Sequence, residues 1–222
     1  MIIAGPPFTS SPLAISLGDP VGVGPELIAE AWARRNAAAL MPFFVAGGGN
    51  VVAAAAQQRG LSVPIERIDH PSDAVEVFTR ALPVLGEIDA KYTPGAPSPA
   101  GAVLTLASLE QATGLTRVGA ASAIVTAPIA KLELARAGFH YPGQTEFLAS
   151  ACGRPADDAV MMLAGPSLRT VPLTVHCALA DVPGLISIDL IRNKARIVAA
   201  ALERDFGIAQ PRIAFCALNP HA

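Results

Sequence analysis

Short apolar runs alternate with helical patterns along the chain, and glycine or proline ends almost every run. The run Leu13–Leu17 stops at Gly18, and the run Pro42–Ala46 stops at three consecutive glycines. Such runs are typical of buried strands that enter tight turns, and the segments after them carry apolar residues at helical spacing. Strands that alternate with helices predict an α/β layered fold with a substantially parallel or mixed sheet.

The expected elements follow from this alternation. We predict strands at 13–17, 42–46, 121–126, 160–163, 170–175 and 212–218, and helices at 26–36, 51–59, 98–114, 131–137, 145–152 and 189–206. The segment 69–96 is polar and rich in proline, and we interpret it as an irregular insertion that forms a second lobe. Ligands of open α/β sheets bind where loops leave the carboxyl ends of strands, so the candidate residues are sought there.

The composition narrows the classes of function. Eighteen acidic and 16 basic residues give a net charge of −2, which provides no basic field for nucleic acid phosphates. No apolar run reaches the roughly 18 residues that a membrane span needs. Three widely separated cysteines do not suggest a disulfide framework. We therefore expect a soluble, cytoplasmic protein that binds neither nucleic acid nor membrane.

The first candidate site is the glycine-rich loop Gly18–Glu26, which precedes a predicted helix. Its backbone N–H groups are suited to binding an anion at the helix N-terminus. The loop matches neither the G-x-G-x-x-G pattern nor a phosphate loop that ends in Gly-Lys-Ser/Thr, so the usual nucleotide fingerprints are absent. A tight structural turn is the competing interpretation.

Three side chains are candidates for binding a phosphate or a carboxylate. Lys131 follows a predicted strand, and its ammonium group can neutralise an anion, although most lysines are simply solvated. Gln144 and Thr145 stand at the start of a predicted helix, where both can donate hydrogen bonds to an anion and the helix dipole assists. In the competing interpretation, Thr145 only caps that helix.

Two histidines are candidate metal ligands because each follows a predicted strand. His176 comes after 170–175, and His221 comes after 212–218. Neutral imidazole binds borderline metals well. A lone histidine is more often structural, and two alone make an incomplete metal site. Cys177 adjoins His176, but neighbours along a strand face opposite sides, which argues against a Cys–His nucleophilic pair.

Five motifs cover the chain from about Leu13 to its end. They are Gly18–Glu26, Val125–Lys131, Gly138–Glu146, Thr174–His176 with Asp181–Pro183, and Leu218–Ala222. Together, and in this order, they resemble the 4-hydroxythreonine-4-phosphate dehydrogenase family of vitamin B6 biosynthesis. The resemblance implies a three-layer α/β/α fold of the isocitrate/isopropylmalate dehydrogenase type with two lobes. It also implies that residues 1–222 are the N-terminal two thirds or so of such an enzyme, with the C-terminal part missing.

The resemblance further implies a homodimeric oxidoreductase that uses NAD or NADP and a divalent metal, either Zn, Mg or Co. Such an enzyme oxidises 4-phosphohydroxy-L-threonine to a β-keto acid that loses carbon dioxide and gives 3-amino-2-oxopropyl phosphate. His176 and His221 match two of three metal ligands at the subunit interface, and Thr145, Gln144 and Lys131 match substrate-binding positions. The third histidine and most cofactor contacts belong to a later segment of the family, so we expect no dehydrogenase activity from the chain as written.

Two positions depart from the family pattern. Gln144 replaces a histidine, and Ala130 replaces an asparagine. Glutamine donates a hydrogen bond but carries no positive charge, so it should attract phosphate less strongly. These departures leave open a dehydrogenase of another phosphorylated hydroxy acid, such as threonate or erythronate phosphate. An inactive truncated chain is the non-enzymatic alternative.

Overall fold

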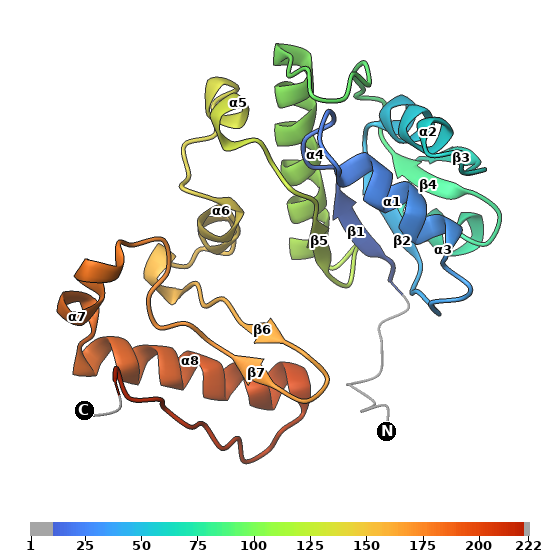
Figure 1. Cartoon of the computed structure of the whole chain (residues 1–222). Coiled ribbons are helices and arrows are strands. Elements are labelled where there is room, and N and C mark those ends of the chain that lie inside the picture. The colour runs from blue at the N-terminus through green and yellow to red at the C-terminus, as the bar shows by residue number, and fades with distance from the viewer. Residues whose placement is uncertain (1–10, 220–222) are drawn as a thin grey trace. The chain divides into compact units, whose positions relative to one another are not determined.

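The computed structural model describes residues 11–219. They divide into two compact units, which we call the N-terminal unit (described over residues 11–141) and the C-terminal unit (142–219). Figure 1 labels the helices and strands of both. Within the described range no helix is long and apolar enough to cross a membrane.

The N-terminal unit contains a five-stranded sheet with the order β3-β4-β2-β1-β5. All of its neighbouring strands are parallel, and Ala14 of β1 is paired with both Phe44 and Ile124. This arrangement confirms the predicted α/β class with a parallel sheet. The strands are β1 (Leu13–Ser16), β2 (Phe43–Ala46), β3 (Ile65–Ile68), β4 (Leu82–Leu85) and β5 (Ile124–Thr126).

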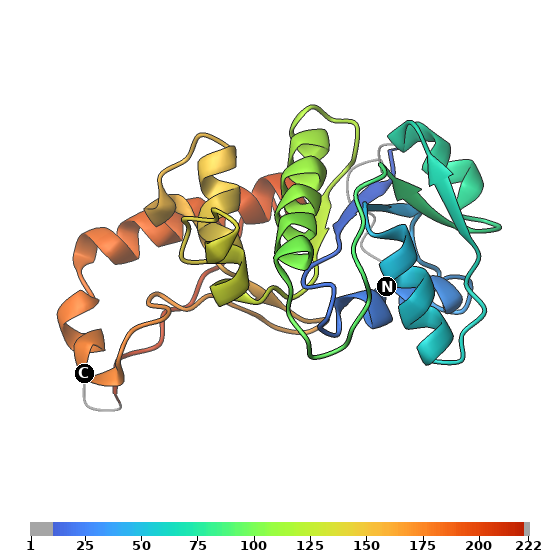
Figure 2. The same cartoon turned by 90° about the horizontal axis from the view of Figure 1, so that it is seen from above.

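Helices cover both faces of this sheet, because alternate strand residues enter two different apolar clusters. Phe43 packs in one cluster with residues of α1 and α2, and Phe44 packs in the other with residues of α3 and α4. Helix α4 lies against β1 and β5 (Figure 1 and Figure 2). The helices are α1 (Gly24–Ala33), α2 (Gly49–Gln58), α3 (Ala74–Val77), α4 (Pro99–Arg117) and α5 (Lys131–Arg136).

The segment 69–96 does not form the expected lobe. It contains α3, which packs against one face of the sheet, and β4, which pairs with both β2 and β3. Pro83 lies within β4 and has no N–H to donate to the ladder, and the polar, proline-rich pattern of 69–96 suggested irregular strands and loops. Leu82 and Val84 are nevertheless fully buried. Their burial stabilises the strand and makes it part of the core.

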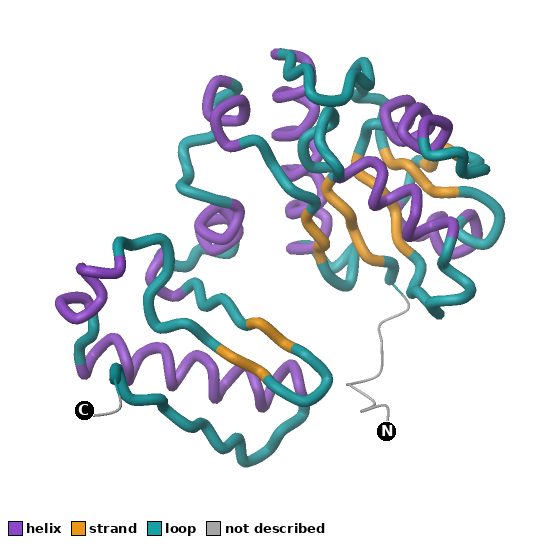
Figure 3. The backbone as a smooth tube through the Cα atoms, in the orientation of Figure 1, coloured by secondary structure: helices purple, strands orange, loops and turns teal. Residues whose placement is uncertain are grey.

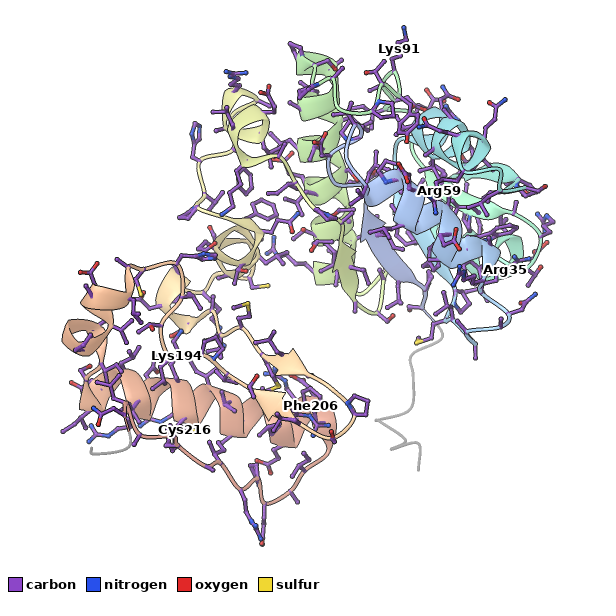
Figure 4. All side chains as sticks on the ribbon, viewed as in Figure 1. Arg35, Arg59, Lys91, Lys194, Phe206 and Cys216 are labelled. Atoms are coloured by element: carbon purple, nitrogen blue, oxygen red, sulfur yellow. The ribbon has the colours of Figure 1, made fainter. Side chains whose placement is uncertain are left out.

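The C-terminal unit is built mainly from helices and loops. Lys194 of its longest helix donates hydrogen bonds to the carbonyl oxygens of Asp157 and Ala159, at 3.0 and 2.8 Å (Figure 4). These bonds fix the loop after the first helix to the last one. The elements are α6 (Gln144–Ala151), β6 (Leu163–Ala164), β7 (Arg169–Thr170), α7 (Val182–Leu185) and α8 (Ile188–Phe206).

The strand predictions in this unit are largely wrong. In place of 160–163 and 170–175 the chain forms a two-residue antiparallel pair, β6 with β7. The stretch 212–218 is loop (Figure 3). Leu163 and Phe215 are more than half exposed. A strand requires a hydrogen-bonding neighbour as well as an apolar pattern, and residues 142–219 offer these segments none beyond the short β6–β7 pair.

Candidate active site

The strand order places a topological switch point beside β1. The chain passes from β1 to β2 on one side, and later returns through α4 to β5 on the other side of β1. In open parallel sheets the ligand crevice lies outside the carboxyl ends of the strands at such a point. The loop Gly18–Val23 leaves β1 there, and the loop 127–130 leaves β5. Both loops lie at the sheet edge where the sequence predicted them.

Three amides of the first loop are already engaged. The Asp19 N–H donates to the Pro128 carbonyl oxygen at 2.8 Å. The Gly22 N–H donates to the Asp19 carbonyl oxygen at 3.1 Å, and the Val21 N–H donates to Asp19 Oδ1 at the same distance. These three groups are therefore not free to hold an anion. For this loop the structure favours the tight-turn interpretation.

Side chains and a neighbouring loop fix the turn further. Thr105 of α4 donates its hydroxyl to the Gly18 carbonyl oxygen at 3.0 Å, and the Gly95 N–H donates to the Val21 carbonyl oxygen at 2.9 Å. A cavity of only about 10 Å³ remains between the turn, α4 and the start of α5. That is about the space of one water molecule. The turn is packed rather than open to a ligand.

Lys131 is the first residue of α5 and is exposed. Its ammonium group makes no ion pair or hydrogen bond within the described part of the chain, and Glu133 pairs instead with Arg136 at 2.8 Å. Leu134, at 1% exposure, anchors the same helix in the core. A free cation therefore stands on a fixed helix after β5, as the sequence predicted. Its role as a phosphate ligand stays a prediction.

Asp89 is a site residue that the sequence reasoning did not single out. Its carboxylate accepts hydrogen bonds from the Asn50 and Val51 N–H groups at the start of α2, at 2.8 and 3.4 Å. Arg67 lies 3.8 Å away from the same carboxylate. The glycine-rich start of α2 is thus occupied by an internal anion. Asp89 follows β4 and therefore lies at the same sheet edge, and this position in the sequence is the feature that could have identified it.

In the C-terminal unit, Gln144 and Thr145 begin α6. The N-cap is Gly143, and no described side chain caps the helix, so the idea that Thr145 is the cap is wrong. Thr145 is exposed and lines an open hollow of about 310 Å³ together with Arg154 and Asp158. This volume is at the lower end of the range for small-molecule sites. Sequence motifs gave no indication of Arg154 or Asp158.

His176 is placed differently from the expectation. It is exposed and follows a bend rather than a buried strand, with a φ of +54° in the left-handed region that non-glycine residues seldom adopt. His221 lies outside the described residues. Within residues 11–219 there is no group of three or more His, Cys, Asp or Glu side chains that could hold a metal ion. The joint role of His176 and His221 therefore stays a prediction.

A parallel sheet covered by helices on both faces, with a packed glycine turn and the exposed Lys131 beside its switch point, defines a protein of the open α/β class. Residues 39–222 match the family described as "Pyridoxal phosphate biosynthetic protein PdxA". The chain belongs to this family.

Two relatives show how far the similarity extends. The chain is 60% identical over 211 residues to the 4-hydroxythreonine-4-phosphate dehydrogenase of Erythrobacter litoralis, which covers 95% of this chain and 63% of that protein. It is 49% identical over 213 residues to the enzyme of the same name from Zymomonas mobilis, with 95% and 62% covered. The chain thus spans less than two thirds of the length of these relatives.

Solved structures agree with the fold. The chain resembles a 4-hydroxythreonine-4-phosphate dehydrogenase from Klebsiella pneumoniae with a TM-score of 0.82 and 28% identity, over 95% of this chain and 65% of that one. It also resembles a terephthalate 1,2-cis-dihydrodiol dehydrogenase from Burkholderia xenovorans with a TM-score of 0.60 and 26% identity, over 95% and 62%. The higher scores belong to the first of these two enzyme types.

Proposed function

We propose that the chain is the N-terminal part of a 4-hydroxythreonine-4-phosphate dehydrogenase. The enzyme would oxidise the 3-hydroxyl of 4-phosphohydroxy-L-threonine to 2-amino-3-oxo-4-phosphooxybutanoate, with NAD or NADP as the hydride acceptor. Loss of carbon dioxide then gives 3-amino-2-oxopropyl phosphate, a precursor of pyridoxal phosphate. The observation that carries the proposal is the 60% identity with the Erythrobacter litoralis enzyme over almost the whole chain.

The proposed substrate contacts are made by Lys131, Thr145 and Gln144. The Lys131 ammonium group neutralises the phosphate, and its lack of a partner among the described residues leaves it available. Thr145 donates its hydroxyl to an anionic group of the substrate from the start of α6, where no described side chain caps the helix and the helix dipole favours negative charge. Gln144 adds a neutral donor. The substrate is therefore held through its phosphate, away from the carbon that is oxidised.

A divalent metal (Zn, Mg or Co) and the cofactor belong to the same proposal. His176 and His221 would be two of the metal ligands, in a cytoplasmic homodimer with the metal at the subunit interface. Residues 11–219 do not fit a metal centre by themselves, since no three-ligand group is present among them. The turn after β1 does not fit a dinucleotide cradle, because its Asp19, Val21 and Gly22 amides are bonded internally. We therefore derive no reaction step through the metal or the cofactor.

The proposal is tested by turnover. The 222-residue chain is compared with a chimera in which it is joined to the part of the Erythrobacter litoralis relative that the match does not cover. Both are assayed for NADH or NADPH formation with 4-phosphohydroxy-L-threonine and a divalent metal. We expect turnover by the chimera and none by the shorter chain. A folded chimera that forms no reduced cofactor would overturn the proposal, and comparable rates would place the cofactor site within residues 1–222.

A second substrate class is supported by the two departures at Gln144 and Ala130. The loss of a chargeable imidazole at Gln144 and of an amide at Ala130 leaves room for another phosphorylated hydroxy acid, such as threonate or erythronate phosphate. The same chimera is therefore assayed with these compounds. A higher kcat/KM for either of them than for 4-phosphohydroxy-L-threonine would establish the alternative.

A further inference from the structure

The turn after β1 comes unusually close to the loop after β5. A Cβ atom added at Gly18 would lie 2.5 Å from the Pro128 carbonyl oxygen, and one added at Gly24 would lie 3.0 Å from Ala127 Cβ. The Gly24 Cβ would also lie 2.6 Å from the Leu17 carbonyl oxygen. Distances below 3.0 Å are closer than Cβ atoms come in folded proteins, and the nearest atom in each case is a backbone carbonyl oxygen, of Pro128 for Gly18 and of Leu17 for Gly24. Only glycine therefore permits this contact without a backbone shift.

Two other glycines of the N-terminal unit, Gly60 and Gly114, do not have this constraint. Gly60 has a φ of +67°, close to the +72° of Gly18, but nothing lies within 4 Å of its Cβ position. Gly114 lies within α4 and also has open space where a Cβ would be. Gly60 thus serves only the backbone conformation, and Gly114 has neither a positive φ nor a close neighbour. Gly18 and Gly24 instead allow two backbone segments to approach closely. This difference provides matched controls.

A short segment, residues 127–130, connects this contact to Lys131, and hydrogen bonds and a proline restrict its conformation. The Asp19 N–H donates to the Pro128 carbonyl oxygen at 2.8 Å, and the Ala127 N–H donates to the Ser16 carbonyl oxygen at 3.2 Å. The proline ring fixes φ at Pro128, and only two residues separate Pro128 from Lys131. The turn itself is tied to α4 through Thr105. The loop before α5 is therefore held by hydrogen bonds to β1 and to the turn, and the turn is held by a hydrogen bond to α4.

We propose that Gly18 and Gly24 are positioning residues for Lys131. By allowing the turn to sit directly against Ala127 and Pro128, they set the place from which the Lys131 ammonium group meets the substrate phosphate. The proposal rests on the substrate contact proposed for Lys131 and explains why a glycine-rich loop whose Asp19, Val21 and Gly22 amides are bonded internally lies at the switch point. The loop thus affects substrate binding through the position of Lys131 and makes no substrate contact of its own.

The experiment compares two matched pairs of substitutions. Gly18→Ala is paired with Gly60→Ala, because both place an alanine at a similar positive φ and only the first meets the backbone of Pro128. Gly24→Ala is paired with Gly114→Ala, because neither has a positive φ and only the first meets other atoms. Hydrogen exchange of the amides 127–134 is measured in the 222-residue chain, and KM and kcat are measured in the chimera.

We expect exchange at 127–134 to rise in Gly18→Ala and Gly24→Ala but not in their controls. We also expect KM for 4-phosphohydroxy-L-threonine to rise about tenfold in these two variants with kcat almost unchanged, because a displaced lysine weakens ground-state and transition-state binding alike. A purely structural role would lower the active fraction, and hence kcat, without changing KM. Urea unfolding of each variant verifies that it is folded, and Gly24→Ala serves if Gly18→Ala does not fold.

Two results would overturn the inference. Equal exchange at 127–134 in Gly18→Ala and Gly60→Ala would show that the turn does not hold the loop. Increased exchange with an unchanged KM would show that the held loop does not position Lys131. Both results are distinct from failure of the proposed function, which is read from turnover by the unsubstituted chimera.

Discussion

The two units differ in what holds them together. Thirty of the 32 buried apolar residues belong to the N-terminal unit, whereas within residues 142–219 only Val198 and Leu202 reach that level of burial. In the C-terminal unit Leu179 is 88% exposed and Ile188 is 73% exposed. Both units have well-formed helices, but only one has a core. Local sequence pattern is therefore enough to form a helix, whereas a fixed site requires the burial that the N-terminal unit has.

The largest expected effect compares a leucine in each unit. Leu104→Ala should lower the free energy of unfolding by about 2–5 kcal/mol, because Leu104 is fully buried and its truncation leaves a cavity. Leu179→Ala should change it by less than about 0.5 kcal/mol, because that side chain is in water. Urea unfolding measures both. Similar losses would contradict the contrast between the units.

The next effect compares the two proposed phosphate ligands in the chimera. Lys131→Met should raise KM by about ten- to a hundredfold, since hydrogen bonds to charged groups contribute about 1.5–3 kcal/mol. Thr145→Val should raise KM by about tenfold through the loss of one such bond. Initial rates against substrate concentration give both values. An unchanged KM would remove the substituted residue from the phosphate site.

A smaller effect compares two helices of equal length, because α4 and α8 have 19 residues each and a serine N-cap. Ser98 accepts a hydrogen bond from the Gly101 N–H, and Ser187 accepts one from the Leu190 N–H, both at 3.1 Å. Ser98→Ala should lower the free energy of global unfolding by about 1 kcal/mol. Ser187→Ala should fray α8 and leave that free energy almost unchanged. Equal losses in urea unfolding would show that α8 shares the global stability.

The smallest effect concerns ionisation. Burial raises the pKa of Tyr92 above its ordinary value of 10.0, and the negative charge of Glu26, which accepts the tyrosine hydroxyl at 3.3 Å, raises it further. Arg59 opposes this shift (Figure 4). A raised pKa means that the contribution to stability is present below the ordinary value and is lost as pH rises through the folded value.

Tyrosinate absorbance tests this in a Tyr141→Phe background, where Tyr92 is the single tyrosine left. Glu26→Gln should lower the Tyr92 pKa only part of the way to 10.0, because burial, the largest cause, remains. A complete return to the ordinary value would show that the charge of Glu26, not burial, raises the pKa.

In the C-terminal unit, a hydrogen bond from Arg204 lowers the pKa of Asp205, and the contribution of this carboxylate to stability is lost as pH falls.

The sequence predicted those parts of the structure that depend on local pattern. The helix expected at 98–114 is observed as Pro99–Arg117, and the helix at 189–206 is observed as Ile188–Phe206. Strand β4 was not predicted, because a proline such as Pro83 is unusual within a strand. Its stability comes from the neighbouring strands β2 and β3, which the local sequence does not reveal. The strand predicted at 212–218 did not form, because an apolar run without a neighbouring strand gains no hydrogen bonds.

The candidate site follows the same rule. The position of Lys131 after a strand of the sheet could be predicted, because the carboxyl edge of a parallel sheet is a general property of the fold. The contact between Gly18 and Pro128 could not, because the two residues are 110 positions apart and their approach depends on packing. His176 was expected after a buried strand and instead lies exposed beyond a bend, since that strand is not formed.

Hydrogen exchange under native conditions tests the contrast between the units most directly. In the 222-residue chain, amides of β1, β2 and α4 should exchange only through global unfolding, because they belong to the buried core. Amides of α8 should exchange through local openings of clearly lower free energy, since only Val198 and Leu202 of that helix are buried. The same free energy of opening for α4 and α8 would contradict the account, because it would show that the C-terminal unit is as firmly held as the core.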